Sequence, residues 1–101
     1  MRPVQLTQSG VGATSWIRLD RRASTLNTLI ATRLTSGTAT WSLEMTEMDP
    51  PGSATPFVDP AINAVTGNAW SVWLGYVWAY CRLHVTVGTG TVEISVLQGG
   101  P

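Results

Sequence analysis

The most regular pattern of hydrophobic and polar positions lies in residues 76–87, which read YVWAYCRLHVTV. Every second residue is apolar, and this first set comprises Val77, Ala79, Cys81, Leu83, Val85 and Val87. The second set, between them, comprises Tyr76, Trp78, Tyr80, Arg82, His84 and Thr86. A period of two is typical of a strand with one face on a core, whereas a helix would scatter both sets around its axis. The pattern therefore predicts a strand over 76–87 that buries its first set.

A second alternating stretch covers residues 92–97 and follows the glycine-rich sequence GTGT. If both stretches face the same core, the register of a hairpin between them is fixed, because a slip of one residue would invert a whole strand. This register predicts that Val85 faces Ile94 on the inside and that His84 faces Ser95 on the outside.

The sequence of residues 34–45, LTSGTATWSLEM, is similar to that of residues 85–96, VTVGTGTVEISV, at a constant offset. The same register predicts a second hairpin, in which Arg33 faces Glu44 as an opposite-charge pair across the strands. Two similar hairpins, one in each half of a chain of about 100 residues, are typical of a two-sheet sandwich.

The abundance of Thr, Val, Trp and Tyr, with frequent Gly and Pro, favours strands over helices. We predict an all-β protein, a compact antiparallel β-sandwich that is jelly-roll-like or Greek-key, as a single domain over residues 1–101. Strands are expected near residues 2–8, 14–20, 26–35, 38–47, 70–74, 76–87 and 91–98. The inward set is expected to include Leu6, Ile17, Ile30, Leu34, Trp41, Leu43, Val77, Cys81, Leu83, Val85, Ile94 and Val96.

One long Pro-rich loop is expected between the two halves, at residues 49–68, which hold four of the six prolines. Proline rings remove hydrogen-bond donors and stiffen an extended path. Asp59 and Pro60 can cap a single helical turn that runs through Val65 and ends at Gly67. A loop of this length in a small domain is typically functional or disordered.

Charge and apolar run lengths argue against several classes of partner. Six arginines balance six acidic residues and lysine is absent, so a net charge of zero removes the electrostatic basis for binding nucleic acid or an anionic membrane. The longest apolar run, residues 69–81, is too short for a membrane-spanning helix. Cys81 is the single cysteine and cannot form an internal disulfide, and the N-terminus lacks the apolar core of a signal peptide. Synthesis in a cytosol is therefore expected.

No catalytic, cofactor or metal site is expected. His84, the only histidine, has no carboxylate in obvious reach that could orient it as a base. One histidine, one cysteine and six scattered acids show no metal-ligand spacing. The sequence Gly88-Thr89-Gly90 joins two predicted antiparallel strands, so we interpret it as a turn and not as a phosphate-binding loop. The chain is thus not expected to be an enzyme.

The strongest functional feature is a row of outward side chains that we call the aromatic ladder: Tyr76, Trp78, Tyr80 and Arg82. Exposed aromatic residues beside arginine are enriched where proteins meet, so the ladder is a candidate partner interface. The loop residues Phe57 and Val58 are included in this candidate interface. The alternative is that Phe57, Val58 and Ile62 of the same domain cover the ladder. A third interpretation, a platform for sugar rings, has thin polar support from Thr86, Glu93 and Ser95.

Three stretches of the chain resemble small virion proteins of tailed bacteriophages: MRPVQLTQSGVG at residues 1–12, WIRLD at 16–20 and RLHVTVGTGTVEISVLQG at 82–99. The resemblance implies a β-sandwich structural protein of the capsid decoration or cement kind, which binds and stabilises the shell of major capsid protein. It implies a location on the capsid surface of the virion after synthesis in the host cytoplasm, and it allows copies of the chain itself as further partners. A tail or head–tail component and a carbohydrate-binding host-attachment module are the alternatives. The resemblance supplies no residue-level contacts.

Overall fold

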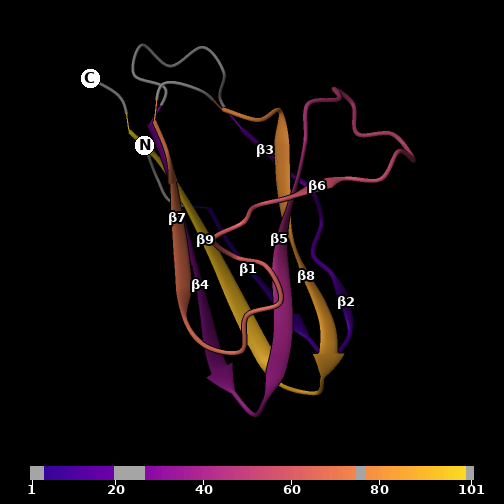
Figure 1. The fold of residues 1–101 in the computed structure, drawn as a ribbon, viewed down its shortest axis with the longest axis vertical. Helices are drawn as coiled ribbons and strands as arrows, with labels where there is room; N and C mark the ends of the chain where they lie inside the picture. Colours follow the sequence, from indigo (N-terminus) through magenta and orange to yellow (C-terminus); the bar gives the residue numbers. More distant parts are fainter. Residues whose placement is uncertain (1–3, 20–26, 75–76, 100–101) are drawn as a thin grey trace.

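The computed structural model describes residues 4–19, 27–74 and 77–99, and these residues form strands connected by loops (Figure 1). The strands are β1 (Val4–Ser9), β2 (Gly12–Ala13), β3 (Ile17–Arg18), β4 (Asn27–Ser36), β5 (Ala39–Thr46), β6 (Phe57–Val58), β7 (Ala69–Trp73), β8 (Tyr80–Gly88) and β9 (Thr91–Gly99). Most of them lie within two residues of the expected ranges. Four strands differ from the expectation: β3 is confined to Ile17–Arg18 within the described residues 14–19, β8 begins at Tyr80, and β2 and β6 were not predicted.

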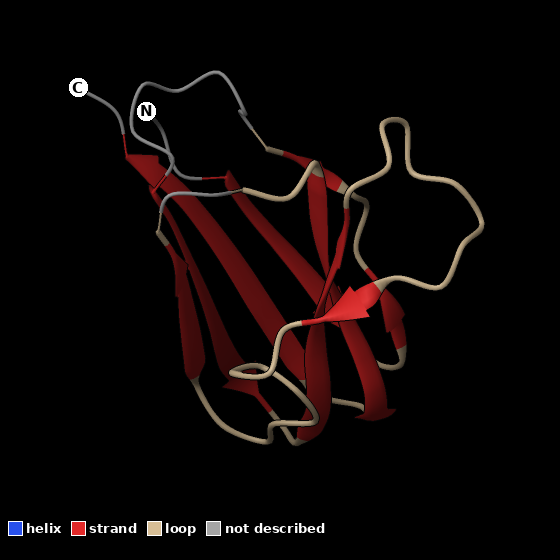
Figure 2. Cartoon of the chain, turned by 45° about the horizontal axis from the view of Figure 1, so that its top comes forward, coloured by secondary structure: helices blue, strands red, loops and turns tan. Residues whose placement is uncertain are grey.

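The strands make two antiparallel sheets that pack face to face (Figure 2). The first sheet has the order β1-β9-β4-β7, and the second sheet has the order β2-β8-β5-β6, with β3 also pairing with β8. Because consecutive strands mostly lie in opposite sheets, this is the strand order of a jelly roll. The predicted antiparallel β-sandwich is confirmed.

The two predicted hairpins are wrong in their pairing. The strand β8 pairs with β5 in the second sheet, and β9 pairs with β4 in the first sheet. The two similar stretches therefore pair with each other, and each turn carries the chain from one sheet to the other. The predicted pair of Arg33 and Glu44 is also wrong, because Arg33 is opposite Glu93 and Glu44 is opposite Arg82. Alternation decides which face of a strand is buried, but not which strand lies beside it.

The core lies between the sheets. Every residue of the expected inward set is either buried or packed against the buried cluster. Val87 is the exception among the alternating positions of β8, because it is 62% exposed. The pairing of β8 with β5 skips Thr86 between Thr40 and Trp41, and such an irregularity reverses the face on which the following residue lies.

The Pro-rich loop is held by its own domain. Residues 57–65 run along β5: Leu43 donates its N–H to Ile62 at 2.8 Å and accepts from the N–H of Asp59 at 3.0 Å. The expected helical turn is wrong, since residues 60–64 form turns and bends. Asp59 therefore caps no helix, and its Oδ1 instead accepts the N–H of Ala61 at 2.8 Å within the turn. The side chain of Ile62 is fully buried, which anchors this segment in the core.

Asp59 also ties this segment to the first sheet. Its Oδ2 accepts hydrogen bonds from Ser71 Oγ and Trp73 Nε1, both at 2.8 Å and both from β7. Residues 57–65 therefore close one side of the sandwich, between β5 of one sheet and β7 of the other.

Candidate functional site

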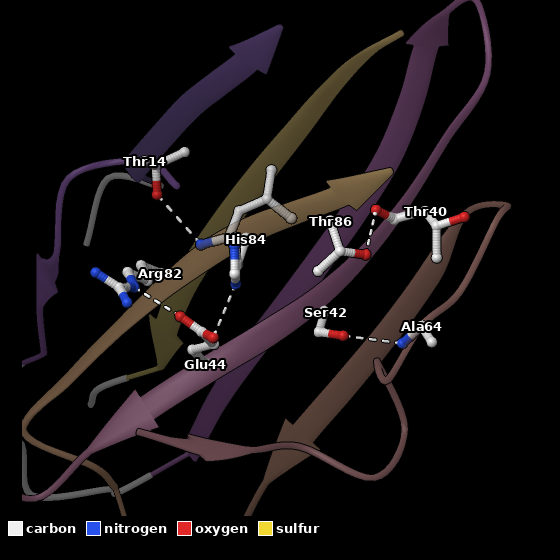
Figure 3. Close-up of polar contacts among 9 residues, drawn as sticks. Thr14, Thr40, Ser42, Glu44, Ala64, Arg82, His84 and Thr86 are labelled. Carbon is white, nitrogen blue, oxygen red and sulfur yellow. Dashed lines mark hydrogen bonds and ion pairs between the residues drawn. The ribbon is translucent and has the colours of Figure 1, made fainter. Parts of the chain in front are cut away.

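The outer face of the second sheet carries a cluster that we call the Glu44 cluster: Glu44, Arg82, His84 and Trp16. Figure 3 shows Arg82 and His84 on either side of the Glu44 carboxylate. Arg82 Nε lies 2.7 Å from Glu44 Oε1, and His84 Nδ1 lies 2.9 Å from Glu44 Oε2. The guanidinium carbon of Arg82 lies 4.3 Å from the centroid of the Trp16 ring, which is the geometry of a cation–π contact. One carboxylate thus accepts from two neighbouring side chains of β8.

Strand register explains this cluster. Glu44 and Arg82 are direct partners across β5 and β8, and His84 is two residues further along β8 on the same face. Only 12% of the Glu44 side chain is exposed, so these partners supply most of the hydrogen bonds that water cannot provide there. A carboxylate only accepts hydrogen bonds, so His84 is the donor in this contact, through Nδ1–H.

The expectation that no carboxylate lies within reach of His84 is therefore wrong. His84 is opposite Ser42 on β5 and Ala13 on β2, and not opposite Ser95. Ser42, the nearest hydroxyl by register, accepts the N–H of Ala64 through its Oγ at 2.9 Å. The Ser42 hydroxyl thus helps to hold the Pro-rich loop beside β5.

The structure separates the members of the aromatic ladder. Tyr76 lies outside the described residues. Trp78 precedes β8 and is half-buried: it packs against the core and contacts Phe57, with ring centroids 5.3 Å apart. The prediction that Trp78 lies on the outer face of a strand is wrong, because regular pairing begins only at Tyr80. The alternation at residues 77–79 thus does not correspond to a strand.

Tyr80 and Arg82 do lie on the outer face of β8, and each has polar partners. The Tyr80 hydroxyl donates to Asp49 Oδ1 at 3.1 Å, and Arg18 Nη2 lies 3.8 Å from Asp49 Oδ2. Phe57 and Val58 are exposed on the short edge strand β6. The fold therefore brings Phe57 next to Trp78 and places Tyr80 with Arg82. The interface role of the six candidate residues stays a prediction.

A second surface, which the sequence interpretation missed, lies on the outer face of the first sheet. We call it the apolar patch: Leu29, Trp70, Val72, Leu74 and Leu97. Leu29 is opposite both Val72 and Leu97, so these three form a row across β7, β4 and β9. The exposed fractions of the five residues lie between 38% and 66%. Contiguous exposed apolar surface of this kind typically marks a contact with another molecule.

The same sheet buries polar side chains on its opposite face. Thr28, Thr32, Ser71 and Gln98 are buried beneath the sheet. Their hydrogen bonds are internal: Gln98 Nε2 donates to Thr28 Oγ1 at 3.3 Å, and Ser71 Oγ donates to Asp59. Around Leu29, apolar side chains thus lie on the outer face of the first sheet, and several polar side chains lie on its inner face. The alternation that would have revealed the apolar patch lies in residues 69–74, which read AWSVWL. Tryptophan occurs in both alternating sets, at positions 70 and 73, so hydropathy alone did not show which set faces outward.

Within residues 4–19, 27–74 and 77–99, no group of three or more His, Cys, Asp or Glu side chains could hold a metal ion. The same parts of the chain contain no helix with the length and hydropathy needed to cross a lipid bilayer.

No protein-family model matches the chain, and no curated protein matches it. Among solved structures, the chain is similar to a chain of the structure described as "Bacillus endospore appendages form a novel family of disulfide-linked pili". The TM-score is 0.53, and the match covers 99% of this chain and 87% of the other at 12% sequence identity. At this identity the likeness concerns the fold alone, and it agrees with the sandwich described above.

Proposed function

We propose that this protein is a bacteriophage virion structural protein that decorates the capsid and cements its shell by binding major capsid protein. The observation that carries the proposal is the apolar patch on the outer face of the first sheet. Its row of Leu29, Val72 and Leu97 is apolar over three adjacent strands. A structural protein of this kind needs a docking surface and no active site.

The composition of the patch supports a protein partner. All five of its side chains are apolar and Trp70 is 66% exposed, so a contact here would remove a large area of apolar surface from water. Tryptophan is also among the residues that contribute most to binding where proteins meet. Weak contacts of this type add up when a shell repeats them by symmetry.

A pilus or appendage subunit is the second candidate, favoured by the description of the similar structure. That description names disulfide-linked pili, whereas Cys81 is the single cysteine of this chain and is buried. A link through Cys81 would require the core to open. We therefore favour association through the apolar patch, in which no covalent bond is needed.

The proposal is tested with virions purified from the phage that encodes the chain. Quantitative mass spectrometry should give a copy number comparable to that of major capsid protein, whereas a tail or head–tail component would be present in few copies. Shells depleted of the protein should lose thermal stability and regain it when the purified protein is added back. Depleted shells of unchanged stability would overturn the cement role.

Variants then locate the docking surface. Leu97→Ser removes an apolar side chain from the patch, and Val11→Ser removes an exposed apolar side chain from the turn between β1 and β2, outside the patch. We expect Leu97→Ser to weaken binding to depleted shells and Val11→Ser to leave it unchanged. Equal binding by the two variants would show that another face makes the contact. A glycan array probed with the wild-type protein tests the carbohydrate alternative.

A further inference from the structure

The strand β7 forms one edge of the first sheet, and β4 is its one strand neighbour among the described residues (Figure 1). In an antiparallel strand the N–H and C=O groups of alternate residues point to opposite sides. The N–H of Leu34 donates to Asn68 Oδ1 at 3.0 Å, next to the start of β7. Leu34, and with it every second residue of β4 before it, therefore directs its backbone groups toward β7.

The register then assigns the backbone groups of β7 itself. The residues of β4 that face β7 are Thr28, Ile30 and Thr32, and their partners are Trp73, Ser71 and Ala69. These three residues of β7 bond to β4. The residues between them, Trp70 and Val72, direct their N–H and C=O groups to the open edge.

Natural edge strands usually carry features that prevent pairing with another chain, such as lysine, proline or a bulge. The sequence of β7 is AWSVW, which contains no charge and no proline, and its register with β4 has no irregularity. The edge strands β2, β3 and β6 have two residues each, too few for stable pairing. The strand β1, at the other edge of the first sheet, presents polar Gln5, Thr7 and Ser9 outward.

We propose that β7 pairs with β7 of a second copy of this chain, antiparallel about a two-fold axis at Ser71. In this register Trp70 is opposite Val72 of the partner subunit, and Val72 is opposite Trp70 of the partner subunit. Each of these pairs exchanges both backbone hydrogen bonds, which uses the groups that point to the open edge. Pairs of an aromatic and a β-branched side chain are among the favourable cross-strand pairs.

Self-complementarity is the reason to choose a second copy as the occupant. An antiparallel two-fold pairing brings the same strand to both sides, and a net charge of zero gives two copies no overall repulsion. The two four-stranded first sheets would become one sheet of eight strands. The apolar patches would join around the axis and stay open to a further partner. The inference thus goes beyond the proposed function and does not depend on it.

Sedimentation of the full-length chain and two variants at position 72 tests the pairing. Val72→Pro removes an N–H that faces the open edge, a place where sheets tolerate proline, and Val72→Thr keeps that N–H with a side chain of similar shape. We expect the wild type and Val72→Thr to sediment at twice the single-chain mass of 10.8 kDa, and folded Val72→Pro to sediment at the single-chain mass. A wild type of single-chain mass, or an unaffected Val72→Pro dimer, would overturn the proposal.

Disulfide cross-linking provides a test that does not need the proline variant to fold. Directly opposite residues of a hydrogen-bonded pair have Cα atoms about 5.5 Å apart, which a disulfide can span. A mixture of Trp70→Cys and Val72→Cys proteins should therefore form a disulfide-linked dimer under mild oxidation. Each variant alone should form far less, because equal positions lie on the longer diagonal, and the native Cys81 is buried. Absence of a dimer in the mixture would refute this register.

The shell-binding test and the dimer tests can each give a negative result without affecting the other proposal. Leu97 lies two strands from the open edge, so Leu97→Ser should lose shell binding and still form the dimer. Val72→Pro should lose the dimer, and its shell binding is not compared because Val72 itself belongs to the apolar patch. A protein that binds shells as a single chain would refute the dimer and leave the proposed function standing.

Discussion

The N–H of Gly90 donates to the carbonyl oxygen of Thr38 at 2.9 Å, although the two residues lie in different turns of the chain. These turns, after β4 and after β8, carry the chain from one sheet to the other. They pack backbone on backbone at the end of the sandwich, where the two similar sequence stretches meet. The similar stretches, residues 34–45 and 85–96, thus occupy equivalent positions in the fold: each contributes to one strand of the first sheet and to one strand of the second sheet.

Gly90→Ala should destabilise the fold. An added Cβ would lie 2.7 Å from the carbonyl oxygen of Ser36 and 2.8 Å from the N and O of Thr38, all backbone atoms that cannot move singly. We expect the free energy of unfolding to fall by about 2–3 kcal/mol, as for overpacked interiors. Gly67→Ala is the control, because its Cβ would meet nothing within 4 Å. Chemical denaturation measures both, and similar losses in the two variants would contradict the packing argument.

Glu44→Gln should show whether the Glu44 cluster stabilises the second sheet. The amide keeps the shape of the side chain but removes the charge that accepts from Arg82 and His84. We expect a loss of about 1–2 kcal/mol in the free energy of unfolding, because the charge-assisted hydrogen bonds of a buried carboxylate become neutral ones. Glu47→Gln makes the same change at an exposed position and should cost little. Equal midpoints for the two variants in urea would assign the cluster no role in stability.

The sequence was sufficient to predict the class of fold, most strand positions and which residues point inward, because burial leaves a period-two signal in each strand. Strand partners were not predictable from it. Val85 satisfies the core equally well beside Ile94 or beside Trp41, and only the three-dimensional fold selects Trp41. The failure to place Glu44 beside His84 follows from this ambiguity, whereas the misplacement of Trp78 follows from the start of β8 at Tyr80.

The apolar patch was missed for a different reason. Its recognition depends on knowing that Ser71 and Thr28 are buried, and their burial depends on hydrogen bonds to residues distant in the sequence. Ser71 bonds to Asp59, and Thr28 bonds to Gln98. Until these partners are known, the expected arrangement places serine and threonine outside.

Asp59→Ala should be more disruptive than Ser71→Ala. The Asp59 carboxylate is buried and accepts from Ala61, Ser71 and Trp73, so its removal leaves three donors without their acceptor. We expect a loss of about 2–4 kcal/mol for Asp59→Ala and about 1 kcal/mol for Ser71→Ala, which removes one donor and leaves the others bonded. Thermal denaturation compares the two variants. A larger effect from Ser71→Ala would mean that the carboxylate does not hold residues 57–65 against β7.

Cys81 should make stability fall at alkaline pH. Burial raises the pKa of the Cys81 thiol from 9.0 to about 12, because the core disfavours the thiolate. The unfolded chain ionises at the lower pKa, so the contribution of the thiol is complete below pH 9 and is lost as pH rises toward 12. Between pH 8 and pH 10 the wild type should lose about 1.4 kcal/mol more than Cys81→Ala, which has no thiol to ionise. Denaturation curves at the two pH values measure this difference, and parallel pH profiles for the two proteins would show that the thiol is accessible to solvent.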